Sequence, residues 1–423
     1  MIVLRAAIFH APNHELAAYL DGGLAVAEGQ VVACGDYTTV RGAHPEATVR
    51  DLRGGYLLPG LIDTHVHFPQ IRILGNFGFE LLDWLRRFTI PEEERLADRA
   101  YAHRIAREFV NGLLSHGTTT ALAFGSHFSA ATAELFEAAG ESGLRLFSGL
   151  VLSDRNLSSK LHTSPEQAYR QSKDLISRFH QRGRLRYAVI PRFALSTTEP
   201  MLAVCQTLLK EDSTLGFTTH INENAQEVAS VKRMFPWAGD YLDVYQHFDL
   251  VQRRSVLAHN VHATDAEIGR ICEHDATVAH CPASNAFLGS GIFPLARHRR
   301  LGARVALGTD VGGGTGFGLL KEGLQTYLMQ RVAAEPISLT AGQLLHLATR
   351  AGAEALGIEK ETGDFEVGKA ADFIYLRPPE DSTLAAVLKS AEQPERILAA
   401  IFTLAGAESI REVRIAGDLV FGL

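Results

Sequence analysis

Two histidines, spaced two residues apart, stand at the end of an apolar run within residues 59–70. On an extended strand, His65 and His67 point to the same side, because side chains alternate between the two faces of a strand. Two imidazoles on one side can bind a single metal ion, since neutral imidazole is a common metal ligand. The pair alone is a weak signal, because two exposed histidines leaving an edge strand would look the same.

Further ligand-capable side chains stand where other apolar runs end. His220 follows the fifth such run of the chain and Asp310 follows the eighth. Three imidazoles and one carboxylate can hold a divalent metal and leave one coordination position for water, whose pKa falls towards neutrality. We therefore predict that His65, His67, His220 and Asp310 are the metal ligands.

Other polar residues at these run ends are candidates for proton transfer. Glu223 stands three residues after His220, where it can shuttle protons between the water and a ring nitrogen. Its alternative role is that of an acidic residue near a helix N-terminus, which we assign instead to Glu227. His259, at the end of the sixth run, can orient the attacking water or stabilise developing charge. For His280, at the end of the seventh, a ligand-shell role and a structural turn both stay open.

Eight apolar, β-branched runs in the middle of the chain predict strands. They are residues 61–64, 118–124, 144–151, 185–190, 216–219, 255–258, 276–279 and 304–308. Longer segments with helical periodicity lie between them, among them residues 92–115, 131–142, 165–180 and 264–273. This alternation predicts an α/β fold, a (β/α)₈ barrel of the TIM type, whose catalytic groups lie at the carboxyl ends of the strands. A doubly wound open sheet is the alternative, but no Gly-X-Gly-X-X-Gly follows the first strand.

Both ends of the chain alternate short apolar runs with turn signals, such as Gly22-Gly23 and Gly54-Gly55. This pattern is typical of short antiparallel strands. We expect residues 1–58 plus 367–423 to form one small composite β domain, and residues 59–366 to form the catalytic barrel. The three glycines after Asp310 lack the Gly-Lys-Ser/Thr ending of a phosphate-binding loop, so we expect them to let the backbone approach the site closely.

The composition argues against several classes of partner. A formal net charge of −7 gives no basic surface for nucleic acid or an anionic membrane. No run approaches the roughly 18 apolar residues of a membrane span, and the first ten residues lack the pattern of a signal peptide. The four cysteines have no Cys-X-X-Cys spacing, which favours a reducing cytoplasm. We expect a cytoplasmic protein that acts on a small molecule.

The motifs together resemble the amidohydrolase superfamily and, within it, the guanine deaminases. The resemblance rests on PGLIDTHVHFPQ (59–70), LLDWL (81–85), HGTTT (116–120), PRF (191–193), THINENAQE (219–227), LAH (257–259), HCPASN (280–285) and GTDVGGG (308–314). The metal motifs point to the superfamily. The Phe-Pro-Gln after the paired histidines, together with Pro-Arg-Phe, points to guanine deaminases.

This resemblance implies a homodimeric enzyme with one Zn²⁺ per chain that hydrolyses guanine to xanthine and ammonia in purine catabolism or salvage. It matches His65, His67, His220 and Asp310 to the zinc ligands, Glu223 and Asp310 to the proton-transfer carboxylates, and Gln70, Arg192, Phe193 and His259 to the purine contacts. The residue types agree with these roles. A glutamine amide both donates and accepts, an arginine can donate to a carbonyl oxygen, and a phenylalanine can stack on a flat ring.

Two alternatives stay open. One keeps the metal but changes the substrate to another aminopurine, a pterin or a cyclic amide. A binuclear cyclic amidase would need a bridging lysine at the end of the fourth strand, where this chain has Arg192. The other alternative is a catalytically silent homologue that serves as a scaffold or binding partner, which missing metal ligands would have indicated; none is missing.

Overall fold

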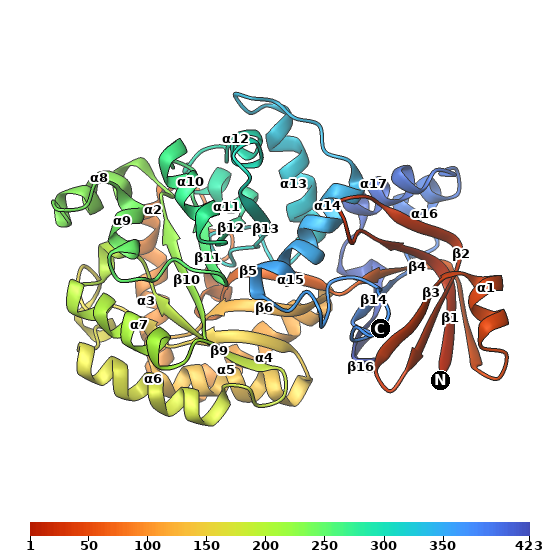
Figure 1. The fold of residues 1–423 in the computed structure, drawn as a ribbon, viewed down its shortest axis with the longest axis horizontal. Helices are drawn as coiled ribbons and strands as arrows, with labels where there is room; N and C mark the ends of the chain where they lie inside the picture. The colour runs from red at the N-terminus through yellow and green to blue at the C-terminus, as the bar shows by residue number, and fades with distance from the viewer.

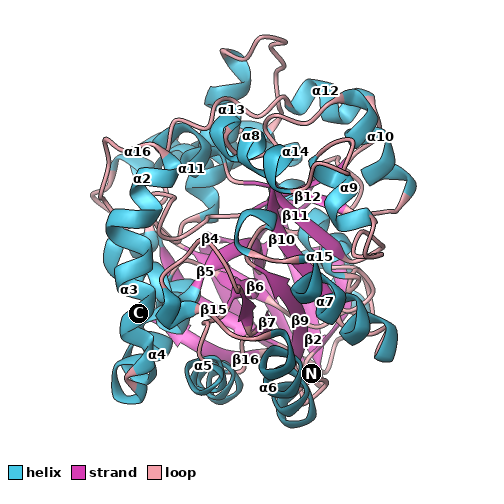
Figure 2. Ribbon diagram, turned by 90° about the vertical axis from the view of Figure 1, so that its left-hand side faces the viewer, coloured by secondary structure: helices cyan, strands magenta, loops and turns pink.

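The computed structural model describes residues 1–423. A barrel ringed by helices occupies the left of Figure 1, and an open sheet that carries both chain termini lies to its right. Figure 2 shows the strands in magenta with helices packed around them. No helix is long and apolar enough to span a membrane.

Eight parallel strands form the barrel, as the sequence predicts. They are β5 (Leu61–His67), β6 (Thr118–Phe124), β7 (Arg145–Gly149), β9 (Leu185–Pro191), β10 (Gly216–Ile221), β11 (Ser255–His259), β12 (Thr277–His280) and β13 (Arg304–Leu307), hydrogen-bonded in that order, with the short β8 (Val151–Leu152) beside β9. The last strand, β13, lies beside the first, β5. Thr64 Oγ1 of β5 donates a hydrogen bond to the Leu307 carbonyl of β13 at 2.8 Å. The chain therefore closes into a (β/α)₈ barrel.

Helices surround the barrel and its mouth. They are α2 (Leu81–Trp84), α3 (Ile90–Glu94), α4 (Arg99–Ser115), α5 (Ser129–Ser142), α6 (Pro165–Phe179), α7 (Glu199–Glu211), α8 (Ala225–Met234), α9 (Tyr241–Gln246), α10 (Asp265–Glu273), α11 (Pro282–Phe287), α12 (Leu295–Arg300), α13 (Leu319–Arg331), α14 (Ala341–Ala348) and α15 (Arg350–Leu356). Shorter helical turns are η1 (Phe68–Ile73), η2 (Leu85–Thr89), η3 (Arg95–Ala97), η4 (Ser159–Leu161), η5 (Ala194–Ser196) and η6 (Ala407–Ser409).

The expectation of one helix over residues 92–115 is wrong, because the chain breaks at Asp98. The backbone of Asp98 is extended, and its carboxylate accepts the N–H groups of Ala100 and Tyr101. Asp98 is thus the N-cap of α4, and a capping carboxylate satisfies amides that would otherwise have no partner in the first turn. The break detaches α3 from α4 and lets α3 approach the mouth of the barrel.

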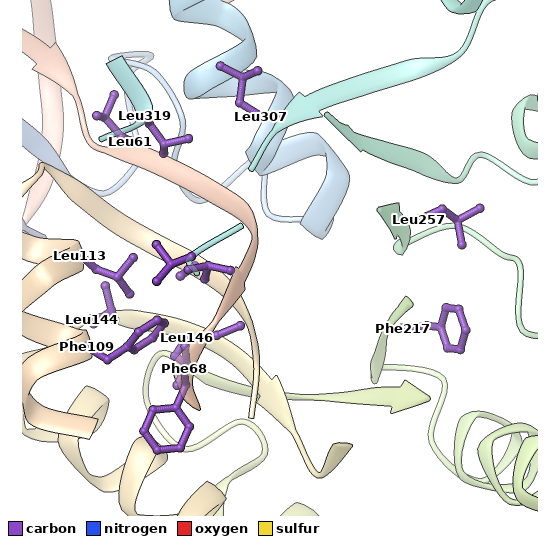
Figure 3. Packing of buried hydrophobic residues seen from close by; sticks show 14 of the residues in the cluster. Leu61, Phe68, Phe109, Leu113, Leu144, Leu146, Phe217, Leu257, Leu307 and Leu319 are labelled. Atoms are coloured by element: carbon purple, nitrogen blue, oxygen red, sulfur yellow. The ribbon is translucent and has the colours of Figure 1, made fainter. Parts of the chain in front are cut away.

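Alternate residues of the strands face two different cores. Leu257 of β11 belongs to the large cluster between strands and helices, whereas its neighbours Val256 and Ala258 belong to a smaller cluster inside the barrel. Figure 3 shows the outer cluster, where Phe109 and Leu113 of α4 pack near Leu146. Each such side chain contributes about 1.5–3 kcal/mol when it is fully buried. This packing holds the strand ends, and hence the site, in fixed positions.

The second sheet combines both ends of the chain. Its order is β16 (Asp418–Gly422), β15 (Ile410–Ile415), β14 (Phe373–Leu376), β4 (Thr48–Pro59), β1 (Ile2–His10), β2 (Ala17–Ala27) and β3 (Gln30–Asp36), with α1 (Tyr37–Ala43) between β3 and β4. The expectation of purely antiparallel strands is wrong at one place, because β1 pairs with β4 in parallel. Gly22-Gly23 and Gly54-Gly55 lie inside β2 and β4 rather than in turns.

The segment between β14 and β15 forms two helices, α16 (Thr383–Leu388) and α17 (Pro394–Leu404), and α17 packs against α13 and α14. We propose residues 1–58 plus 367–423 and residues 59–366 as the two domains, with α17 joining them.

Candidate active site

Four metal-capable side chains meet at the carboxyl end of the barrel. His67 Nε2 lies 3.3 Å from His65 Nε2 and 3.2 Å from His220 Nε2. Asp310 Oδ1 lies 3.4 Å from His65 Nε2 and 3.2 Å from His67 Nε2. All four residues are buried. The structure thus brings together the four residues that the sequence predicts as ligands, and we call them the metal cluster.

The metal cluster fits a divalent metal ion. Burial lowers the pKa of His65 to about 3 and also lowers the pKa of His67 and His220, so these imidazoles are neutral and offer lone pairs. Burial acts to raise the pKa of Asp310, but its contacts with His65 and His67 outweigh burial and hold that pKa well below its usual range. Ligands about 2.0–2.2 Å from a tetrahedral metal are about 3.3–3.6 Å apart, close to the separations seen here.

Barrel closure sets the position of Asp310 against His65. The Asp310 N–H donates to the His65 carbonyl at 2.8 Å, and the His67 N–H donates to the Val311 carbonyl at 2.9 Å. Asp310 has a φ of +49°, which turns its carboxylate away from the strand direction. A Cβ on Gly308 would lie 2.7 Å from the His65 Cβ, so glycine is required for this close approach.

The glycines after Asp310 also permit close approach, as expected from the sequence. A Cβ on Gly312 would lie 2.5 Å from the Gln70 carbonyl oxygen.

His220 is oriented through the backbone. Its Nδ1 lies 2.6 Å from the Arg192 carbonyl oxygen, so Nδ1 carries the proton and donates it. Its Nε2 lone pair then faces His67 and the metal cluster. Such a partner on the far nitrogen fixes the tautomer and the ring plane of a metal-binding histidine.

Glu223 and His259 lie beside the metal cluster. His259 Nε2 is 3.6 Å from Glu223 Oε2 and 3.9 Å from Asp310 Oδ2. His259 Nδ1 lies 2.9 Å from Asn285 Oδ1, which accepts its proton and directs Nε2 into the site. That Nε2 atom is buried without a hydrogen-bond partner, and it lies within 4.8 Å of ligand atoms of His65 and His220. A ligand in the pocket can therefore supply its partner.

The surroundings of Glu223 favour the protonated form of its carboxyl. Burial is the largest cause that raises the pKa of Glu223 well above its usual value. The negative charges of the nearby Glu227 and Asp310 act in the same direction. The Ser290 hydroxyl donates to Glu223 Oε1 at 3.5 Å. Glu227 instead completes a capping box with Asn224 and accepts the Glu223 N–H, in agreement with the helix role predicted for it. A neutral carboxyl next to an ionised one can deliver a proton and take it back.

A pocket opens above the metal cluster. Its polar and aromatic side is formed by Gln70, Arg192 and Phe193, which we call the pocket wall. The remaining apolar lining is Leu81, Trp84, Leu85 and Leu288. The buried polar groups of the pocket wall can fix the orientation of a small ligand.

Comparison with known proteins gives the family. The model described as "Amidohydrolase family" matches residues 56–420, which is most of the chain. The chain belongs to the amidohydrolase family. This family is metal-dependent, which agrees with the metal cluster.

Several proteins that are similar over nearly the whole chain carry closely related names. A protein of Deinococcus radiodurans named "Probable guanine deaminase" is 52% identical over 433 residues, covering 100% of this chain and 99% of its own. The "Guanine deaminase" of Escherichia coli is 37% identical, covering 95% and 91%. The solved structure titled "E. coli Guanine Deaminase" superposes with a TM-score of 0.96 at 34% identity, covering 100% of each chain.

His280 does not join the ligands of this amidohydrolase. It is buried and stacks on Phe293 at 4.6 Å between ring centroids, and neither ring nitrogen has a hydrogen-bond partner. Its ligand atoms are not among those that converge at the metal cluster. Between the two roles left open for His280, the contacts favour a structural one.

Sequence reasoning missed two buried residues behind the pocket wall, Glu93 and His127. His127 follows β6 by three residues, so the rule that polar residues at strand ends are functional would have found it. Glu93 lies on α3, between two other glutamates, and no pattern in the sequence separates it from them.

Proposed function

We propose that this amidohydrolase converts guanine and water to xanthine and ammonia. The observation that carries the proposal is the shared pocket, in which the pocket wall faces the metal cluster and Glu223. Such a pocket can hold a flat heterocycle by its polar groups while a water attacks its amino-bearing carbon. The names and high identities of the relatives support guanine as the substrate.

We propose one Zn²⁺ per chain, held by His65, His67, His220 and Asp310. Three imidazole nitrogens and one carboxylate oxygen suit zinc, and the bound metal supplies a water whose pKa lies near neutrality. The lysine that bridges two metals in cyclic amidases is replaced here by Arg192, and this supports a single ion.

In this proposal the chain's own residues move the protons. Glu223 donates its proton to the ring nitrogen beside the amino-bearing carbon, and the ionised Asp310 accepts a proton from the attacking water. His259 Nε2 lies near both carboxyl groups and is placed to orient the water or stabilise developing negative charge. Asp310 then passes the proton that it took from the water to the amino group, which leaves as ammonia. The hydroxyl left on the ring carbon returns a proton to Glu223 and becomes the new carbonyl.

The pocket wall binds the ring in this proposal. Arg192 donates to the carbonyl oxygen of guanine, Gln70 donates to and accepts from the ring edge, and Phe193 packs against the ring. The apolar residues around them exclude bulk water, which strengthens each of these polar contacts.

The test is a substrate panel with the zinc-loaded protein. We expect ammonia and xanthine from guanine, and much slower turnover of adenine and of an aminopterin. Glu223→Gln should lower kcat by about 10²–10⁴-fold, the usual contribution of a general acid–base group, with unchanged metal content. Glu267→Gln is the matched control, because Glu267 is also a buried glutamate of a capping box but does not contact Glu223. Absence of turnover with guanine would refute the proposal.

We further propose that the enzyme is a cytoplasmic homodimer acting in purine catabolism or salvage. The support is the resemblance to guanine deaminases for the dimer and the pathway, and four cysteines without a disulfide for the compartment. Light scattering of the purified protein measures the assembly, and a mass of one chain, 46.1 kDa, would contradict a dimer.

A further inference from the structure

A buried carboxylate joins the two polar residues of the pocket wall. Glu93, on α3, accepts a hydrogen bond at Oε1 from Gln70 Nε2 at 2.9 Å and another from Arg192 Nη1 at 3.0 Å. Its second oxygen, Oε2, lies 3.2 Å from His127 Nε2. Glu93 is only 2% exposed and does not itself line the pocket. It therefore lies behind the pocket wall and contacts the ligand only through Gln70 and Arg192.

Glu93 fixes how Gln70 presents its amide. A carboxylate only accepts hydrogen bonds, so the amide nitrogen of Gln70 must face it. The amide oxygen then accepts the Gly312 N–H at 3.4 Å. Without Glu93 the two ends of the amide could exchange, and the pocket would present a donor and an acceptor in either order. The same oxygen of Glu93 binds Arg192, so both side chains converge on one point.

Glu93 also sets the charge of the pocket wall. Burial acts to raise the pKa of Glu93, but Arg192 and His127 outweigh it and lower that pKa to about 2, so Glu93 is ionised. Burial lowers the pKa of His127, which is therefore neutral. The buried ion pair of Glu93 and Arg192, 3.0 Å apart, then has no net charge. Arg192 can donate hydrogen bonds to a ligand without presenting an uncompensated cation.

We propose that Glu93 is a positioning residue that orients Gln70 and Arg192 and keeps the pocket wall electrically neutral, so that the pocket favours an uncharged oxo-heterocycle over an anionic ring of the same shape. The inference deepens the proposed function, and it rests on it only in assigning guanine to this pocket. Removing the charge of Glu93 leaves a buried, unpaired guanidinium, which attracts anions strongly because the surroundings screen it poorly.

The chain supplies a matched control one residue away. Glu92 is also buried, at 6% exposed, but its carboxylate accepts hydrogen bonds from the Tyr101 hydroxyl and from Arg95 instead of contacting the pocket wall. Glu92→Gln and Glu93→Gln remove the same charge from the same helix. Only the second change alters the partners of Gln70 and Arg192.

The experiment compares one ligand in two charge states. Xanthine is bound at equilibrium to the zinc-loaded wild type, Glu92→Gln and Glu93→Gln, below and above the pH at which its ring loses a proton. We expect wild type and Glu92→Gln to bind the neutral form in preference to the anion. In Glu93→Gln the ratio of the two affinities should move towards the anion by about tenfold or more, the worth of one interaction with a charged group. An unchanged ratio would overturn the proposal.

Glu93→Asp separates charge from position and also serves if Glu93→Gln does not fold. Aspartate keeps the negative charge but is one methylene shorter, so it cannot reach both Gln70 and Arg192. We expect the preference for neutral xanthine to persist, while KM for guanine rises about tenfold and kcat changes less. Loss of that preference, or an unchanged KM, contradicts the proposal. A wild type that binds xanthine but does not turn over guanine refutes the proposed function, and the binding ratios still test Glu93.

Discussion

The metal cluster and the pocket wall share one cavity but are held in place by different means. The residues of the metal cluster stand at or just beyond strand ends, where backbone hydrogen bonds such as Asp310 N–H to His65 C=O fix their spacing. The pocket wall comes from η1 and from the segment after β9, and its polar groups are held by a side chain, Glu93.

This difference separates chemistry from specificity. A site fixed by strand register keeps its geometry when neighbouring side chains change, because the barrel core maintains the register. A site fixed by side-chain hydrogen bonds changes when one of its members changes, since each buried donor or acceptor depends on its partner. The metal cluster should therefore tolerate changes in the pocket wall.

The largest expected effect is from a change in the metal cluster. His220→Asn removes one imidazole, so we expect metal content to fall well below one equivalent and guanine turnover to fall by at least about a thousandfold. Elemental analysis and an ammonia assay measure both. His280→Asn is the control, since His280 is an equally buried histidine outside the metal cluster, and its folded protein should retain the metal. Full metal content in His220→Asn would remove His220 from the ligand set.

A smaller effect is expected from the pocket wall. Arg192→Lys replaces a planar group of several donors with a single ammonium, which cannot serve both Glu93 and the ligand. We expect kcat/KM for guanine to fall about 10–100-fold, the loss of one hydrogen bond from a charged donor. Metal content should stay at the wild-type level, because His220 is oriented by the Arg192 backbone carbonyl, which the substitution preserves. Loss of metal in this variant would contradict the separation of the two regions.

The smallest effect on activity is expected from Glu322, which contacts the site only through the helix that carries the partner of His259. It accepts the Ala283 N–H at the start of α11, the helix that carries Asn285, the partner of His259. Burial raises its pKa from 4.5 to about 8, so the folded protein holds a proton that the unfolded chain releases between these values. The free energy of unfolding therefore falls as pH rises through this window.

Glu322→Gln should remove that part of the pH dependence and change turnover by no more than about twofold. Denaturant unfolding at several pH values measures the pH dependence of the free energy of unfolding. Glu335→Gln, at an exposed residue whose pKa is lowered, should leave the slope in this window unchanged. If the free energy of unfolding of Glu322→Gln fell with pH as steeply as in the wild type, Glu322 would not be the group that causes this pH dependence.

The sequence predicts the barrel and the metal cluster well because both depend on local patterns. Each buried apolar strand ends at a specific residue, and a histidine or aspartate at such an end is placed by the fold itself. His65 and Asp310 are far apart in the chain, yet each can be recognised from its own neighbours. The parallel pairing of β1 with β4 was not predictable in this way, since it depends on contacts between distant segments.

The three consecutive glutamates of α3 show where sequence reasoning ends. Glu92 binds Tyr101, Glu93 joins the pocket wall, and Glu94 forms an ion pair with Lys160. The three residues are chemically identical, and only the direction in which the helix presents each one distinguishes them. The break at Asp98, which frees α3 to approach the pocket, was also missed, because its capping role competes with an uninterrupted helical pattern.

The hydrogen bond between Asp310 and His65 has a consequence for biosynthesis. It joins the last strand of the barrel to the first, so a ribosome must translate almost the whole barrel before the fourth ligand can reach the other three. The second sheet likewise awaits β14, β15 and β16 from the end of the chain. An incomplete nascent chain cannot bring the four residues of the metal cluster together, so a metal ion held by all four would be bound only late in synthesis.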